Sequence, residues 1–149
     1  KKDSKIQIKI YGDGPLKESL IVKSKKLGLK NLTFMGWYPS LCDEFLKCDV
    51  FCIPSLEEPF GLVMGEAMMS GLAVISTKTD GALEIFGNSP EKNGGILVDF
   101  SSPEQLACAI MRLKDQQLRH LISGNAKKNI TKNFTLEKLS LNIKKLINK

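Results

Sequence analysis

The chain has 149 residues, of which 42% are hydrophobic and 26% charged, a composition typical of one globular domain with a buried core. No apolar run approaches the roughly 20 residues that span a bilayer, and no signal-peptide pattern precedes the first strand. The formal net charge is +6, but aromatic residues do not alternate with the basic ones, which argues against a nucleic-acid-binding protein.

Apolar runs alternate with stretches of helical periodicity along most of the chain. Short apolar runs bounded by Gly, Pro or Asp predict strands at residues 6–11, 32–35, 50–53, 72–75 and 95–98. Apolar residues at helical spacing predict helices at residues 16–27, 40–48, 60–70, 103–114, 116–133 and 136–147. This alternation predicts an α/β fold over residues 1–149, a Rossmann-like doubly wound parallel sheet with its site beyond the strands' C-terminal ends.

A glycine-rich turn containing Gly12 and Gly14 follows the first strand and opens the first helix. A strand, a glycine-rich turn and a helix are also the start of a dinucleotide-binding fold. The third glycine of that fingerprint is replaced here by Lys17, whose side chain would crowd the packing of helix on strand. We therefore do not expect a dehydrogenase.

Two glutamates, Glu58 and Glu66, bracket seven residues that begin with Pro-Phe-Gly. We expect Glu58 in the loop after strand 50–53, and Glu66 about two turns further on. Eight helical residues rise roughly 12 Å, close to the reach of a nucleotide sugar from ribose to hexose. The free amides and positive dipole of the helix start suit a diphosphate, and carboxylates accept hydrogen bonds from sugar hydroxyls. The simpler interpretation of the pair alone is a first-turn acid and a solvated helix residue.

The whole string from Glu58 to Gly71 is more specific than the pair. It resembles the donor-site signature of the GT-B-fold retaining glycosyltransferases of family 4 (group 1), as their C-terminal, donor-binding domain. The resemblance covers roughly residues 6–113 through further motifs in the same order: Gly12-Asp13-Gly14-Pro15, Phe34-Met35-Gly36, Pro54-Ser55, Asp80-Gly81-x-x-Glu84 and Asn93-Gly94-Gly95-Ile96-Leu97-Val98.

The resemblance implies roles for individual residues. Glu58 would be the catalytic residue, whose carboxylate contacts the donor sugar, and Glu66 would bind the ribose. The other donor-binding positions that it implies are Gly12, Gly14, Ser55, Phe60, Gly61 and Leu62, the last three through their backbone amides. Trp37 lies in the loop after the second strand, where it either stacks on the nucleotide base or covers an edge of the domain.

The resemblance also implies a reaction, the transfer of a hexose with retention from a UDP- or GDP-linked sugar to a glycan, lipid or polysaccharide acceptor. No metal or other cofactor is expected, because the leaving diphosphate is stabilised electrostatically. A sugar-nucleotide epimerase shares the GT-B fold, but Pro59-Phe60-Gly61 favours the transferase.

Two departures from the family pattern qualify this expectation. Asp80 replaces the first glycine of the motif Gly-Gly-x-x-Glu, which alters the donor pocket. Full-length relatives have a strand–helix unit with an Arg/Lys pair before the equivalent of Ile6, where this chain has only residues 1–5. The alternatives are therefore a non-catalytic nucleotide-sugar-binding module, or one half of a split enzyme completed by an acceptor-binding N-terminal domain or a partner chain. By itself the chain should transfer sugar poorly or not at all.

Two features lie outside the motifs. Four cysteines at spacings that match no zinc or redox pattern are expected to be buried thiols of a cytoplasmic protein: Cys42, Cys48, Cys52 and Cys108. The last helix, 136–147, has apolar residues on one face and lysines on another. It either packs on the domain as a closing helix or makes peripheral contact with the inner face of the membrane.

Overall fold

The computed structural model describes residues 6–147, which form two compact units divided after Leu41. The first unit contains strand β1 (Ile8–Tyr11), helix α1 (Lys17–Lys26) and strand β2 (Leu32–Gly36). β1 and β2 are parallel, and Ile8 lies opposite Leu32. This is one strand–helix–strand unit, as the alternating pattern predicted. The N-terminal segment 1–5, compared above with the family's missing unit, lies outside the described residues.

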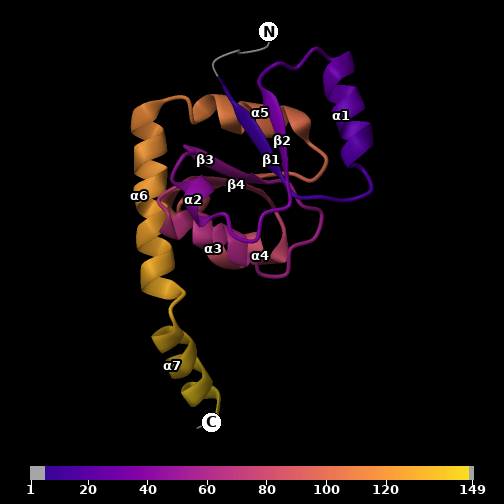
Figure 1. The fold of residues 1–149 in the computed structure, drawn as a ribbon. Coiled ribbons are helices and arrows are strands. Elements are labelled where there is room, and N and C mark those ends of the chain that lie inside the picture. Colours follow the sequence, from indigo (N-terminus) through magenta and orange to yellow (C-terminus); the bar gives the residue numbers. More distant parts are fainter. Residues whose placement is uncertain (1–5, 148–149) are drawn as a thin grey trace. The chain divides into compact units, whose positions relative to one another are not determined.

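The second unit contains the remaining strands and most of the helices. In chain order its elements are α2 (Cys42–Phe45), β3 (Val50–Ile53), α3 (Leu62–Met69), β4 (Ala73–Thr77), α4 (Asp80–Phe86), a 3₁₀ turn (Pro90–Asn93), β5 (Gly95–Val98), α5 (Pro103–Arg112), α6 (Gln116–Asn133) and α7 (Leu136–Ile147). β3, β4 and β5 form a parallel sheet in that order, with β4 in the middle and all five of its residues buried. Helices lie on both faces of this sheet, α5 on one and α3 and α4 on the other (Figure 1).

The two faces of the sheet follow from the alternation of side chains along a strand. Ala73 and Ile75 of β4 point to one face, where they join a buried cluster that includes Ala109 and Leu113. Gly95 of β5 points to the other face, since a Cβ there would lie 2.5 Å from the ring of Phe86 in α4. The α/β fold class with doubly wound parallel strands is therefore confirmed.

The sequence predicted one parallel sheet, whereas the structure has two separate sheets. Within residues 6–147, β1 pairs only with β2, and β3 pairs only with β4. The strand expected between them in a doubly wound order has no counterpart among these residues. In the described residues the strands that pair on one side only are β1 and β2 in the first sheet, and β3 and β5 in the second. The single continuous domain stays a prediction.

Several boundaries and burial expectations were wrong. α2 is four residues long: it begins at Cys42, two residues after the expected cap Ser40, and ends at Phe45 instead of Cys48. α4 and the 3₁₀ turn lie where no helix was predicted. Of the four cysteines expected to be buried, Cys42 and Cys108 are exposed, and Cys48 and Cys52 are half-buried. Cys108 lies off the apolar face of α5, on the far side of the helix from Leu106 and Leu113. No helix between residues 6 and 147 has the length and apolar character needed to cross a bilayer.

Candidate functional site

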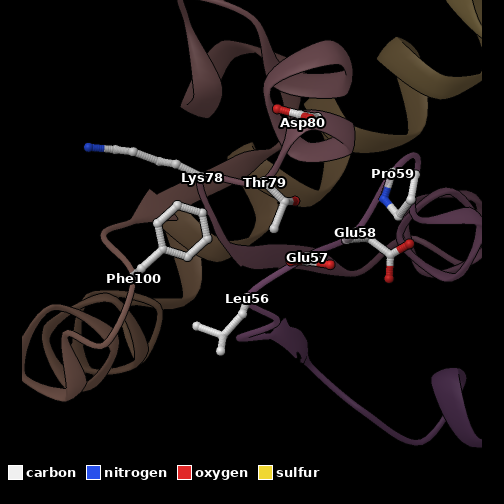
Figure 2. A pocket seen from close by; sticks show the side chains of 8 residues that line it. All are labelled: Leu56, Glu57, Glu58, Pro59, Lys78, Thr79, Asp80 and Phe100. Atoms are coloured by element: carbon white, nitrogen blue, oxygen red, sulfur yellow. The ribbon is translucent and has the colours of Figure 1, made fainter.

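The candidate site lies where β3 and β4 end, at the C-terminal edge of the second unit's sheet. The loop after β3 and the first residues after β4 meet there and enclose a pocket of about 430 Å³ (Figure 2). Its lining residues are Leu56, Glu57, Glu58, Pro59, Lys78, Thr79, Asp80 and Phe100. Crevices at this edge are where open α/β sheets bind ligands. Of these residues, the sequence predicted Glu58 as a site residue and Asp80 as a residue that alters the donor pocket.

The loop that carries Glu58 is fixed to the segment after β4. The amide of Gly81 donates a hydrogen bond to the carbonyl oxygen of Glu58 at 3.0 Å. A Cβ at Gly81 would lie 2.4 Å from the carbonyl oxygen of Phe60, so only glycine permits this approach. The hydroxyl of Thr77 donates to the carbonyl oxygen of Ser55 at 2.5 Å, at the other end of the loop. Ser55 thus contributes a structural backbone contact, and its predicted role at the donor stays a prediction.

Helix α3 begins two residues later than predicted. Gly61 precedes it in a left-handed conformation, with φ of +79°, and is buried. A Cβ at Gly61 would lie 2.2 Å from the Met64 side chain and 3.2 Å from Cγ of Glu58. The side chain of Glu58 therefore lies beside Gly61, the residue that precedes α3.

The first amides of α3 point out of the helix. Those of Met64 and Gly65 donate to the carbonyl oxygen of Gly61, at 2.8 and 3.4 Å. Among the described residues, the amides of Leu62 and Val63 have no acceptor. These two donors and the positive end of the helix dipole make a place for an anionic group beside Glu58.

The pocket has an acidic lining. Glu57, Glu58 and Asp80 contribute three carboxylates, and Lys78 is the one cationic residue among the lining residues. The ammonium of Lys78 lies 2.5 Å from a carboxylate oxygen of Asp99, which is outside the pocket. The hydrogen bond from Lys78, followed by one from Gln105 and by the charge of Lys78, lowers the pKa of Asp99 below its usual value. Lys78 is thus directed outward (Figure 2), and the carboxylates dominate the pocket's charge.

Glu66 is the fifth residue of α3 and lies on its second turn. Its side chain is exposed, and it does not line the pocket. Gly65 beside it is approached by the side chain of Ile130 in α6, which would lie 3.4 Å from an added Cβ. This is an ordinary van der Waals contact with a side chain, and the role of Glu66 stays a prediction.

Three further predicted donor residues belong to the first unit. Gly12 adopts a φ of +126° and Gly14 donates its amide to the carboxylate of Asp13 at 2.9 Å. The pKa of Asp13 is lowered by hydrogen bonds from Lys17 and then from Gly14. Trp37 is 71% exposed, so its ring has a free face within the described residues. The roles of Gly12, Gly14 and Trp37 at a donor stay predictions.

The sequence reasoning missed Phe100 and Lys78 as pocket residues. Each follows the C-terminal end of a predicted strand, β5 for Phe100 and β4 for Lys78. Because parallel strand ends meet at one edge, that position was the available signal. In the part of the chain that the structure describes, no three His, Cys, Asp or Glu side chains come together as metal ligands would.

Comparison with known proteins gives matches over most of the chain. The family described as glycosyl transferases group 1 matches residues 1–129. An uncharacterized glycosyltransferase of Methanocaldococcus jannaschii is 32% identical over 88% of this chain and 34% of its own length. The sulfoquinovosyl transferase SQD2 of Arabidopsis thaliana is 31% identical over 85% of this chain and 25% of its own. The chain thus spans between a quarter and about a third of these relatives.

Solved structures also match. The Anabaena protein HepE in complex with UDP-glucose superposes with a TM-score of 0.81 at 25% identity, covering 95% of this chain and 40% of HepE. The C-terminal domain of a glycosyl transferase group 1 protein from Francisella tularensis, LpcC, gives a TM-score of 0.72 at 30% identity, covering 81% of this chain and 63% of that one.

Proposed function

The chain belongs to the glycosyl transferases of group 1, and we propose that it forms the donor-binding part of an enzyme that transfers a hexose from a nucleoside diphosphate sugar. One observation carries this proposal. The side chain of Glu58 lies over Gly61, directly before the unpartnered amides of α3, and Glu58 also lines the pocket at the strands' C-terminal edge. A carboxylate in this position would hold sugar hydroxyls beside a site for phosphate.

In this proposal the diphosphate binds at the start of α3. The amides of Leu62 and Val63, and the helix dipole, would stabilise the negative charge that grows on the leaving diphosphate. Glu58 would hold hexose hydroxyls, and Glu66, further along the same helix, would bind the ribose diol. We propose a UDP- or GDP-linked donor, with UDP supported by the UDP-glucose complex of the similar HepE structure.

We further propose that the hexose is transferred with retention of its anomeric configuration to a glycan, lipid or polysaccharide acceptor, without a metal ion. The residues that would bind the acceptor are proposed to lie on an N-terminal domain or a partner chain. We also propose a cytoplasmic location, because all four cysteines are free thiols and proteins without disulfides are typical of reducing compartments.

A second function, nucleotide-sugar binding without catalysis by the chain alone, is favoured by the edge strands of the two sheets, which are β1, β2, β3 and β5 in the residues that the structure describes. Unpaired edges are surfaces on which a further strand pairs. In this alternative the chain is a binding module or one half of a split enzyme, and transfer requires the other half.

Isothermal calorimetry of the chain with UDP, GDP and UDP-glucose tests donor binding, with circular dichroism to verify folding. We expect heat with UDP or GDP that is lost with the nucleoside alone, because the diphosphate supplies the contacts at α3. No heat with any nucleotide from a folded sample would overturn both functions. The split enzyme would be supported if the chain alone bound the donor without releasing hexose, and if transfer appeared when a candidate partner chain was added. The anomeric signal of the product by NMR would then decide retention.

A further inference from the structure

Helix α6 packs along α3, the helix whose first amides are proposed to bind the diphosphate (Figure 1). Ile130 and Phe134 lie four residues apart, about one turn, and therefore face α3 together. The side chain of Ile130 contacts Gly65, where an added Cβ would lie 3.4 Å from its Cδ1 atom. The ring of Phe134, the residue that caps the end of α6, lies 6.1 Å from the ring of Phe60, centroid to centroid, at an interplanar angle of 57°. One side of α6 thus follows α3 from its second turn to a residue just before its start.

Phe60 is held from two sides. Its backbone packs on Gly81 of α4, where an added Cβ would lie 2.5 Å from its carbonyl carbon. Its ring, which is 40% exposed, lies against Phe134. Gly61 follows in a left-handed conformation and leads into α3. Because glycine permits many backbone conformations, Gly61 does not by itself fix the direction in which the first amides of α3 point, so that direction depends on how Phe60 is held.

The C-terminal part of α6 is itself fixed to the rest of the second unit. Asn129 is buried, and its side-chain amide donates hydrogen bonds to the carbonyl oxygens of Ile85 and Asn93, at 2.9 and 3.1 Å. A Cβ at Gly94 would overlap Ala126, so α6 lies directly on the turn that precedes β5. Buried and satisfied side-chain hydrogen bonds specify one packing arrangement. The ring of Phe134 therefore extends from a fixed support.

We propose that Phe134 is a positioning residue for the nucleotide sugar: its ring holds Phe60, and thereby orients the amides at the start of α3 toward the diphosphate. The inference rests on the proposed function of those amides, and adds a contribution from a helix that is distant in sequence. Phe134 is not one of the residues that line the pocket, so it acts through Phe60 and not on the ligand. Two aromatic rings at this separation attract each other beyond the burial of their area, which favours one orientation of the Phe60 ring.

Calorimetry with UDP tests whether the ring of Phe134 matters for binding. Phe134→Leu keeps an apolar side chain but removes the ring, and should weaken UDP binding roughly three- to tenfold. Phe134→Tyr keeps the ring and should bind UDP as tightly as the unchanged protein. Equal affinity of Phe134→Leu and the unchanged protein would overturn the inference, and so would an equal loss in the two variants.

Ile122→Val is the control for a general loss of stability. Ile122 lies in the same helix and is fully buried, but it belongs to the buried cluster that includes Ala109 and Leu113. The removal of one methyl group there should lower the midpoint of urea denaturation and leave the affinity for UDP unchanged. A loss of affinity that matched the loss in Phe134→Leu would mean that binding follows stability, and the inference would be wrong.

The amide signals of Leu62 and Val63 in proton–nitrogen NMR spectra report the position of the two donors directly. Without ligand, both signals should shift in Phe134→Leu and should coincide with those of the unchanged protein in Ile122→Val. Unshifted signals in Phe134→Leu would overturn the inference. The proposed function fails separately, if the unchanged protein gives no heat with UDP, and the ligand-free signals still test in that case whether Phe134 positions these amides.

Discussion

The amide of Gly81 donates a hydrogen bond to the carbonyl oxygen of Glu58 at 3.0 Å. This bond joins the start of α4 to the loop that carries Glu58, the candidate catalytic residue. The contact depends on the absence of a side chain at residue 81, where a Cβ would meet the backbone of Phe60. The position of Glu58 is therefore determined jointly by its own loop and by a residue 23 positions later.

Gly81→Ala should destabilise the protein and weaken nucleotide binding. The new Cβ would lie 2.4 Å from the carbonyl oxygen of Phe60, a backbone atom that cannot rotate away, so the loop must move. We expect a loss of about 1–3 kcal/mol in the free energy of unfolding, measured by urea denaturation. Gly124→Ala is the control, because nothing lies within 4 Å of that position in α6, and it should stabilise by about 0.5–1 kcal/mol. A neutral result at Gly81 would contradict the close approach.

Glu58→Gln should weaken donor binding and transfer far more than Glu57→Gln. Both residues line the pocket, but the side chain of Glu58 is the one that lies over Gly61 at the start of α3. Loss of a charged hydrogen bond to a sugar hydroxyl costs about 1.5–3 kcal/mol, roughly a ten- to hundredfold reduction in affinity. Calorimetry with UDP-glucose gives the comparison. Equal effects of the two substitutions would count against the assignment of Glu58.

Asp80→Asn should increase the relative affinity for donors whose sugar carries a carboxylate. Asp80 adds a third negative charge to a pocket whose one lysine is directed to Asp99. Removing one charge several ångströms from a ligand carboxylate should gain roughly two- to fivefold in affinity for a UDP-uronic acid over UDP-glucose. Competition calorimetry with the two donors measures this ratio. An unchanged ratio would mean that the sugar lies away from Asp80.

The bounds of α6 and α7 agree with the sequence prediction because local signals fix both helices. α6 begins after Asp115, whose carboxylate accepts from the amide of Leu118, and both helices have clear apolar spacing. The strands were likewise predicted from short apolar runs between breakers. Glu58 was correctly placed in the loop after β3 because the run Val50–Ile53 ends at a proline.

The start of α3 and the whole of α4 depend on contacts that are distant in sequence. Gly61 adopts a left-handed conformation and has no Cβ, so the side chains of Met64 and Glu58 can approach it, and α3 begins only at Leu62. α4 begins at Asp80-Gly81, a pair typical of turns, and is supported by the cap from Thr79 and by the packing of Gly81 on Phe60. These tertiary contacts cannot be derived from local periodicity, and they build most of the pocket.

Asp115→Ala should destabilise the protein more than Ser102→Ala. Asp115 caps α6, accepting a hydrogen bond from the amide of Leu118 at 2.9 Å, whereas the side chain of Ser102 makes no capping bond to α5. Loss of the Asp115 cap should cost about 1 kcal/mol in the free energy of unfolding, and Ser102→Ala should cost only a few tenths. Urea denaturation of both variants checks the difference. Equal losses would show that the cap contributes nothing specific.

Cys52 should resist alkylation in the folded protein, while Cys108 should react readily. Cys52 lies in β3 against the buried cluster, and this burial raises the pKa of its thiol to about 11. Because the thiolate is the nucleophile, at pH 8 roughly one Cys52 side chain in a thousand is reactive, against about a quarter for an ordinary thiol.

Cys108 is exposed on α5 and serves as the internal control in the same sample. Iodoacetamide labelling followed by peptide mass spectrometry should therefore modify Cys108 well before Cys52, and denaturant should remove the difference. Labelling of Cys52 in the folded protein should rise steadily as the pH is raised toward 11, since deprotonation limits the reaction. Equal labelling of the two residues at pH 8 without denaturant would mean that β3, the open edge of its sheet, separates from the cluster in solution.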